Sequence, residues 1–235
     1  MNILVVNGSP RLAASNTMKL TNAFISAAPQ DAVIKTVQIY KKNIQPCRGC
    51  FSCWGKTAGS CIINDDMRDI LTDMLWADII IESFPLYFFG MPSGMKAMTD
   101  RTLPLMKPYM GDIGVGSAAF HDFRDSSMNS KKVVVISTCG YVQSEPMYPS
   151  LLKQLDLIWG EDNYTSILCP EGEIFISDNA KRQRHGYLSL IKKAGEEYFE
   201  SFSISDKTQN ELKKPILSPK GFEALTLAHR NSTVK

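Results

Sequence analysis

Five short apolar segments recur along the chain, and stretches with helical spacing lie between most of them. The first, Asn2 to Asn7, shows no clean alternation of polar and apolar residues, which is expected for a central strand buried on both faces. Strands that alternate with helices predict a parallel sheet with right-handed crossovers, and five of them predict a doubly wound sheet in the order 2-1-3-4-5. The expected strands are residues 2–7, 33–40, 78–84, 132–138 and 163–169, and the expected helices are 15–28, 67–76, 95–105, 146–159 and 179–201.

One α/β domain, residues 1–201, accounts for all five strands, and residues 202–235 remain as a C-terminal tail. The tail has apolar residues but only one weak helical pattern, over 221–229, so we expect it to pack on its own subunit or on a neighbouring one. Residues 107–130 contain several glycines and little periodicity, which predicts an excursion or lid there.

The composition is that of an ordinary soluble globular domain, with 44% hydrophobic and 21% charged residues. A net charge of +2 gives no reason to expect nucleic acid or an anionic membrane surface as a partner. The start of the chain lacks the basic region of a signal peptide, and the apolar stretch 74–89 is interrupted by Asp78, Glu82 and Pro85. We therefore expect a cytoplasmic protein.

The loop after the first strand contains Gly8-Ser9-Pro10-Arg11 and continues to Ser15-Asn16-Thr17, which opens a helix. In doubly wound sheets, ligands bind at the carboxyl ends of the strands, and a helix N-terminus there offers free N–H groups to a phosphate. The loop is neither the three-glycine dinucleotide fingerprint nor a P-loop, and it suits a single terminal phosphate. The alternative is a simple turn with a helix cap. The candidate phosphate residues are Ser9, Arg11, Ser15, Asn16 and Thr17.

Four of the six cysteines are crowded into fifteen residues, with the spacing Cys-x2-Cys-x2-Cys-x7-Cys. Without an export signal, this crowding favours a metal or redox site over a disulfide scaffold. Three thiols within seven residues resemble the compact half of a ferredoxin site, which predicts a [4Fe-4S] cluster. Zinc, free thiols and an adventitious disulfide are the alternatives. The candidate metal ligands are Cys47, Cys50, Cys53 and Cys61.

An ordered set of motifs over residues 1 to about 170 resembles the NADPH-dependent FMN reductases of the flavodoxin superfamily, and among them the iron–sulfur flavoproteins. The first two motifs are the phosphate loop and the cysteine segment 47–67. The others are residues 83–92 (Ser-Phe-Pro-Leu-Tyr-Phe-Phe-Gly-Met-Pro) and Lys96 with Asp100-Arg101.

The resemblance implies a flavodoxin-like fold that holds FMN at the carboxyl edge of the sheet. It places the isoalloxazine ring along the loop after the third strand, where four bulky residues in a row cannot all face inward. It places a third flavin-contacting loop after the fourth strand. Asp100 and Arg101 are expected to form a structural ion pair or a helix-end contact and not to touch substrate. The implied flavin residues are Pro85, Leu86, Tyr87, Phe88, Phe89, Gly90, Thr138, Cys139, Gly140 and Tyr141.

The function implied by the resemblance is that of an NAD(P)H-dependent FMN oxidoreductase that passes electrons to a small acceptor such as a quinone, with or without a cluster. No side chain is then needed as a nucleophile or acid, because the flavin N5 accepts the hydride. The alternatives are a non-enzymatic electron carrier between protein partners and a scaffold without flavin. The resemblance also implies a homodimer or homotetramer.

Overall fold

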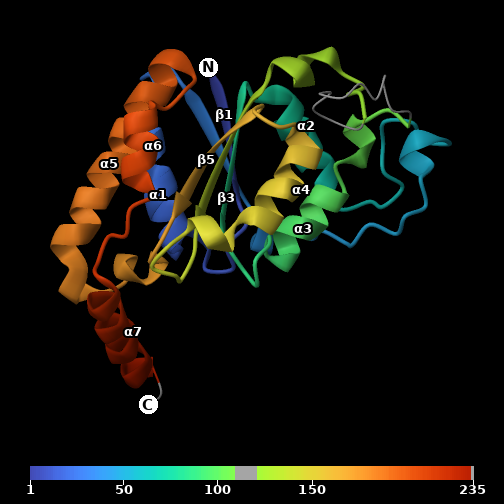
Figure 1. The fold of residues 1–235 in the computed structure, drawn as a ribbon. Helices are drawn as coiled ribbons and strands as arrows, with labels where there is room; N and C mark the ends of the chain where they lie inside the picture. Colours follow the sequence, from blue (N-terminus) through green and yellow to red (C-terminus); the bar gives the residue numbers. More distant parts are fainter. Residues whose placement is uncertain (109–120, 234–235) are drawn as a thin grey trace.

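The computed structural model describes residues 1–108 and 121–233, and it contains a five-stranded, all-parallel sheet in the order β2-β1-β3-β4-β5. This confirms the predicted doubly wound, flavodoxin-like sheet (Figure 1). Each strand begins within one residue of its predicted start. The strands are β1 (Asn2–Asn7), β2 (Val33–Gln38), β3 (Ile79–Pro85), β4 (Lys132–Thr138) and β5 (Tyr164–Cys169).

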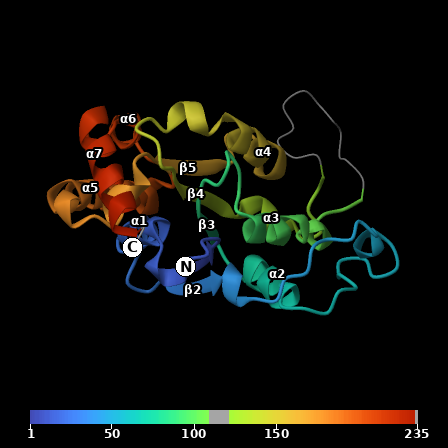
Figure 2. The ribbon, with the colours of Figure 1, turned by 90° about the horizontal axis from the view of Figure 1, so that it is seen from below.

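Helices cover both faces of the sheet and divide the core into two layers. The layer under α1 and α5 contains Phe24 and Tyr198, and the layer under α2, α3 and α4 contains Met67 and Leu151. Figure 2 shows these two groups of helices on opposite sides of the strands. The helices are α1 (Asn16–Ile25), α2 (Met67–Trp76), α3 (Ser93–Asp100), α4 (Pro149–Trp159), α5 (Lys181–Ser201), α6 (Asp206–Leu212) and α7 (Pro219–Thr233).

Several helix boundaries differ from the prediction. The helix predicted over 95–105 ends at Asp100, and a separate short 3₁₀ turn follows at Leu103–Leu105. The helix predicted from residue 146 begins at Pro149, after a 3₁₀ turn over Glu145–Met147. Proline lacks an N–H and suits the first helical turn, so Pro149 favours a helix start there.

The C-terminal tail forms two helices, of which the sequence predicted only the second. Seven-residue α6 is too short to show a helical period, and its start depends on Ser205, whose hydroxyl caps the Thr208 N–H. Leu212 and Phe222 are buried in the core layer under α1 and α5, so the tail packs on its own subunit. None of the helices in the described ranges is long and apolar enough to cross a membrane.

The predicted excursion over 107–130 is described only in part, because residues 109–120 lie outside the described residues. Beyond that gap, Phe123 forms an isolated antiparallel bridge with Met106, and a 3₁₀ turn at Ser126–Ser130 leads into β4. These contacts tie the described ends of the excursion to the amino end of β4.

Candidate functional site

Loops after β1, β3 and β4 meet at the carboxyl edge of the sheet and are hydrogen-bonded to one another. The Gly8 N–H donates to the Ser83 carbonyl at 2.8 Å, and the Leu86 N–H donates to the Thr138 carbonyl at 2.8 Å. The Thr17 and Thr138 hydroxyls also share a hydrogen bond of 2.8 Å. Since β1 and β3 are neighbours whose connections leave in opposite directions, this edge is the switch point where such sheets bind ligands. The structure thus brings the three predicted flavin loops together.

The loop after β1 is fixed by its own side chains. The Ser9 hydroxyl accepts the Arg11 N–H at 3.3 Å, and the Ser15 hydroxyl accepts the Met18 N–H at 2.9 Å as the N-cap of α1. In the described part of the chain, the N–H groups of Asn16 and Thr17 have no acceptor. The first turn of α1 therefore presents two free donors at its positive end.

Asn16 carries the clearest sign of a missing partner at this edge. Its side-chain amide donates to the Gly172 carbonyl at 2.8 Å, whereas its Oδ1 is buried with no hydrogen-bond donor among the described residues. An unsatisfied buried acceptor costs about 1–3 kcal/mol. A ligand hydroxyl or a water at this point would satisfy it.

The loop after β5, which contains Gly172, was not predicted as part of the site, because residues 170–177 contain no binding motif. A Cβ on Gly172 would lie 3.1 Å from the Thr138 Cβ and 3.2 Å from the Cys139 carbonyl oxygen, so the loop after β5 packs tightly against the loop after β4. This close approach makes the loop after β5 a fourth wall of the site.

The loop after β3 folds into a tight turn over Tyr87–Gly90, which we call the aromatic turn. Tyr87 and Gly90 exchange two backbone hydrogen bonds of 3.0 Å. The two central residues, Phe88 and Phe89, have φ values of 47° and 65°, in the left-handed region that glycine favours. Tyr87 is 45% exposed, Phe88 99% and Phe89 43%, so none of the three belongs to the core. Strained residues of this kind cluster at ligand sites.

Replacing Phe88 by glycine is expected to raise the free energy of unfolding by about 1 kcal/mol. Glycine relieves a left-handed conformation that costs about 1–2 kcal/mol, offset in part by its greater backbone entropy. A fully exposed side chain leaves no cavity when removed. Urea unfolding of the two proteins checks this, and a loss of stability would show that the contact between the Phe88 and Phe89 rings outweighs the strain.

The loop after β4 contributes an exposed ring and an open backbone. Tyr141 is 47% exposed and stacks on Phe89 with ring centroids 6.2 Å apart, and a Cβ on Gly140 would meet nothing within 4 Å. Cys139 is buried, and burial raises the pKa of its thiol. Its N–H donates to Cys169 and its carbonyl accepts from Gly172, so its backbone is engaged within the protein. Tyr141 and Gly140 are therefore better placed than Cys139 to contact a ligand.

The four cysteines of residues 47–61 do not gather into a metal site. Cys47 and Cys50 are exposed, Cys61 is partly buried and Cys53 is buried. Among the described residues, no group of three or more His, Cys, Asp or Glu side chains could hold a metal ion. The predicted [4Fe-4S] site, and zinc as its alternative, are not supported by this arrangement of the described residues.

The middle of the cysteine loop also lies away from the carboxyl edge. Arg124 Nη2 donates to the Cys53 carbonyl at 3.3 Å, and the Trp54 ring lies 5.0 Å from that of His121. Residues 121–124 precede β4, so these contacts hold the loop beside the amino end of that strand. In Figure 1 the short helical turn of this loop stands at the far side of the molecule from α1.

A buried ion pair closes the base of the cysteine loop. Arg101 donates from both Nη atoms to Asp65, at 2.8 and 2.9 Å, and also to the Gln45 carbonyl at 2.7 Å. Burial alone would raise the pKa of Asp65, but Arg101 and two backbone N–H donors outweigh it and hold that pKa below its ordinary value. Arg101 thus has the structural role expected for it, although its partner is Asp65, while Asp100 pairs with Lys96.

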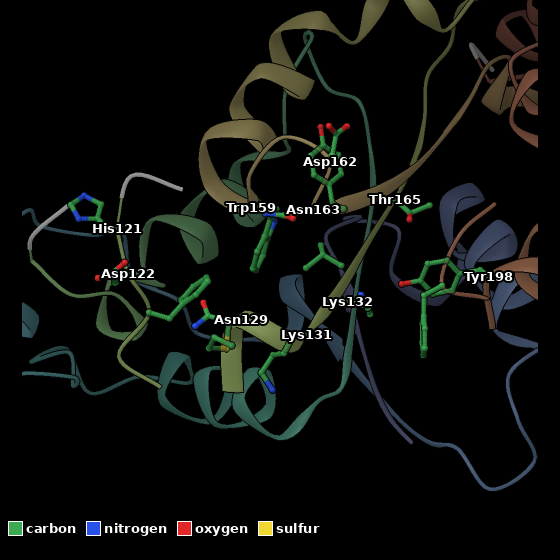
Figure 3. A pocket seen from close by; sticks show the side chains of 15 residues that line it. His121, Asp122, Asn129, Lys131, Lys132, Trp159, Asp162, Asn163, Thr165 and Tyr198 are labelled. Atoms are coloured by element: carbon green, nitrogen blue, oxygen red, sulfur yellow. The ribbon is translucent and has the colours of Figure 1, made fainter. Parts of the chain in front are cut away.

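A polar cavity of about 410 Å³ lies at the opposite edge of the sheet. Lys132 and Val133 at the start of β4 line it, together with Tyr164 at the start of β5, and Figure 3 shows its side chains. The Lys131 ammonium beside it is held by the carbonyls of Leu75 and Ala77. This cavity lies at the amino ends of the strands, away from the convergent loops.

A second, more apolar cavity of about 600 Å³ lies between α3 and α4. It begins at Phe89 and Gly90 of the aromatic turn and continues along Leu103, Leu151 and Leu157. The aromatic turn therefore separates the convergent loops from an apolar groove.

Similar proteins agree with this fold. In sequence, the chain is 34% identical over 105 residues to an iron–sulfur flavoprotein of Methanocaldococcus jannaschii, covering 45% of this chain and 53% of that protein. It is 33% identical over 108 residues to an iron–sulfur flavoprotein of Methanosarcina thermophila, covering 46% and 55%. The chain thus spans about half the length of the curated relatives it matches.

Solved structures with the same fold include an azoreductase from Bacillus anthracis, with a TM-score of 0.62, 18% identity, and coverage of 84% of this chain and 99% of that one. An NAD(P)H:quinone oxidoreductase from Methanothermobacter marburgensis has a TM-score of 0.58 and 15% identity, covering 83% and 94%. At these identities the likeness concerns the fold alone. The family model Flavodoxin_2, described as a flavodoxin-like fold, matches residues 1–157, more than half of the chain, and the chain therefore belongs to the Flavodoxin_2 family.

Proposed function

We propose that this protein binds FMN at the carboxyl edge of its sheet and uses it to transfer electrons from NAD(P)H to a small aromatic acceptor, such as a quinone or azo compound. The observation that carries the proposal is the convergence of three loops at the switch point, with free helix donors on one side and an exposed aromatic turn on the other.

The residues at this edge fit the parts of FMN. The free N–H groups of Asn16 and Thr17, with the exposed Arg11, suit the terminal phosphate. The orphaned Asn16 Oδ1 needs a hydroxyl donor, and the ribityl chain of FMN has several. Tyr87, Phe89 and Tyr141 supply aromatic surface for the ring system.

Bound FMN would supply the chemistry, because its ring accepts a hydride and releases electrons without help from a side-chain acid or nucleophile. The protein's own residues would position the reactants. Two backbone hydrogen bonds hold the aromatic turn, and the Ser150 hydroxyl donates to the Phe89 carbonyl at 2.6 Å. The apolar groove that begins at Phe89 suits a flat, apolar acceptor.

Similar proteins support the cofactor and the reaction class. One structure with the same fold is named an FMN-dependent NADH-azoreductase from Bacillus anthracis in complex with FMN, at a TM-score of 0.59 and 17% identity. The NAD(P)H:quinone oxidoreductase with the same fold also has a name that indicates a small aromatic acceptor. The assembly we propose, a homodimer or homotetramer, can be checked by light scattering.

Replacing Asn16 by alanine is expected to weaken FMN binding by about 10- to 100-fold, which corresponds to losing one buried hydrogen bond of about 1–3 kcal/mol. Quenching of flavin fluorescence measures the Kd. Asn22→Ala is the matched control, because Asn22 is exposed on the same helix. A protein that stays colourless after FMN is added, or two variants that bind FMN equally, would contradict the proposed site.

A second candidate is an electron carrier between proteins, which is favoured by the names of the curated relatives, iron–sulfur flavoproteins. In the described part of the chain the four cysteines form no group that could hold a metal ion, which does not favour a cluster in this role. An anaerobic absorption spectrum with iron and flavin assays on one sample separates the two candidates. Rapid NAD(P)H oxidation by an iron-free yellow protein supports the reductase. About four irons per chain, as a cubane requires, with reduction only by a protein donor, supports the carrier.

A further inference from the structure

Two cationic side chains, Lys19 and Arg184, meet on one carbonyl beside the phosphate loop, and Arg11 of that loop lies near enough for its charge to act on Lys19. Arg11 comes from that loop, Lys19 from the first turns of α1, and Arg184 from the first turn of α5. The Lys19 ammonium donates to the Phe175 carbonyl at 2.6 Å, and Arg184 Nη1 approaches the same carbonyl and that of Ser177, at 3.4 Å each. One carbonyl oxygen thus fixes both cations. We call Arg11, Lys19 and Arg184 the cationic triad.

The charges of the triad act on one another. Burial lowers the pKa of Lys19 most, and the like charges of Arg184 and Arg11 lower it further. Within the described residues, eight ion pairs satisfy other charged side chains, but none includes a member of the triad. The concentrated positive charge therefore lacks a carboxylate at ion-pair distance.

The acidic residues of the neighbouring wall do not neutralise the triad. Glu171 is turned to the C-terminal tail, where its Oε2 accepts the N–H groups of Ile216 and Leu217 at 2.6 and 2.8 Å. Glu173 has a buried Oε2 without a hydrogen-bond partner among the described residues, and it forms no ion pair with Lys19 or Arg184. Neither carboxylate of this wall is therefore an ion-pair partner of the triad in the described part of the chain.

Spare donors point to the kind of anion. Lys19 uses one of its three N–H groups on Phe175, and Arg184 makes its contacts through Nη1 alone, so several donors remain. The wall that holds them is joined to the phosphate loop by the hydrogen bond from Asn16 to Gly172. Several directed donors on three cations match the three oxygens of a phosphate monoester better than a single carboxylate.

We propose that the cationic triad is a subsite for a phosphate monoester dianion on a redox cofactor, either the terminal phosphate of FMN or the 2′-phosphate of NADPH. The inference rests on the proposed function and extends it to Lys19 and Arg184, which no sequence motif marks. In the first case Lys19 and Arg184 add contacts to the FMN phosphate beyond those of the phosphate loop. In the second they make the protein prefer NADPH to NADH.

The test compares Lys19→Met, Arg184→Gln and the double variant with Arg182→Gln, which removes a charge from an exposed position on the same helix. Each protein is titrated with FMN and with riboflavin, and kcat/KM is measured with NADPH and with NADH. Circular dichroism melts verify folding. Lys19→Arg keeps the charge and should retain most of the wild-type behaviour.

A terminal-phosphate site predicts that the double variant loses about 10-fold or more in FMN affinity while riboflavin affinity stays unchanged. A 2′-phosphate site predicts an unchanged FMN affinity and a drop of about 10-fold or more in the NADPH-to-NADH ratio of kcat/KM. Effects no larger than those of Arg182→Gln in both assays overturn the proposal. If neither NADPH nor NADH is oxidised, the proposed reductase activity is wrong. The titrations with FMN and riboflavin then test the subsite by themselves.

Discussion

Replacing Arg101 by leucine is expected to lower the free energy of unfolding by about 3–5 kcal/mol, the usual cost of removing one partner from a buried ion pair. The side chains of Arg101 and Asp65 are 1% and 0% exposed, so the remaining Asp65 carboxylate would be buried without its counter-ion. The Gln45 carbonyl would lose a donor as well. Urea unfolding followed by circular dichroism measures the change.

Lys96→Met is the matched control for Arg101→Leu. It also breaks an ion pair on α3, but Lys96 and Asp100 are 44% and 45% exposed, so the loss should stay below about 1 kcal/mol. Equal losses for the two variants would show that burial does not determine how much the Asp65–Arg101 pair contributes to the free energy of unfolding.

The same pair predicts the response of the wild-type protein to acid. Because the folded-state pKa of Asp65 lies below its ordinary value, its contribution to stability is present above about pH 4 and is lost as the pH falls through the lower, folded-state pKa. Arg101→Leu removes the main cause that lowers the pKa of Asp65. The stability difference between the two proteins should therefore shrink in acid.

The sheet and the main helices were predictable because their signals are local. The central strands β1, β3 and β4 are largely apolar and are buried along most of their length. Met67–Trp76 has its helix start marked by three polar residues just before it. The exposure of the aromatic turn was also predictable, because four bulky residues in a row cannot share one face of an extended chain. Its left-handed φ values were not, since Phe88 and Phe89 carry no turn signal.

The cysteine loop shows where local reasoning fails. The spacing of the thiols is that of a ligand set, yet the path of the loop depends on Arg101 and Arg124, which bind its carbonyls from 56 and 71 residues away. The cationic triad is a similar case, because Lys19 and Arg184 meet only through the fold. Contacts over such separations have no signature in a single sequence.

Replacing Glu82 by glutamine is expected to stabilise the protein by up to about 3 kcal/mol above pH 7 and to change little near pH 4. Glu82 is 1% exposed in the centre of β3, paired with Val6 on β1 and Val135 on β4. Burial raises the pKa of its carboxyl from 4.5 to about 7, against a smaller opposing effect of the nearby Trp159. In the described part of the chain, neither Glu82 Oε2 nor Trp159 Nε1 makes a regular hydrogen bond.

The direction follows from proton binding. Between pH 4.5 and 7 the folded protein keeps the Glu82 proton while the unfolded chain releases it, so Glu82 lowers stability progressively as the pH rises through this window. At about 1.4 kcal/mol per pKa unit, the displacement from 4.5 to about 7 corresponds to about 3 kcal/mol. Glutamine has a similar shape and no charge to bury, so the dependence should disappear.

Urea unfolding at several pH values from 4 to 8.5 tests this expectation. The control is Glu161→Gln, which makes the same chemical change at an exposed position and should leave the pH profile unchanged. If the wild-type and Glu82→Gln profiles run parallel, the carboxylate must find donors as it ionises, for example by Trp159 closing on it. Burial would then not determine the proton affinity of Glu82, and the ionised carboxylate would not destabilise the folded protein at neutral pH.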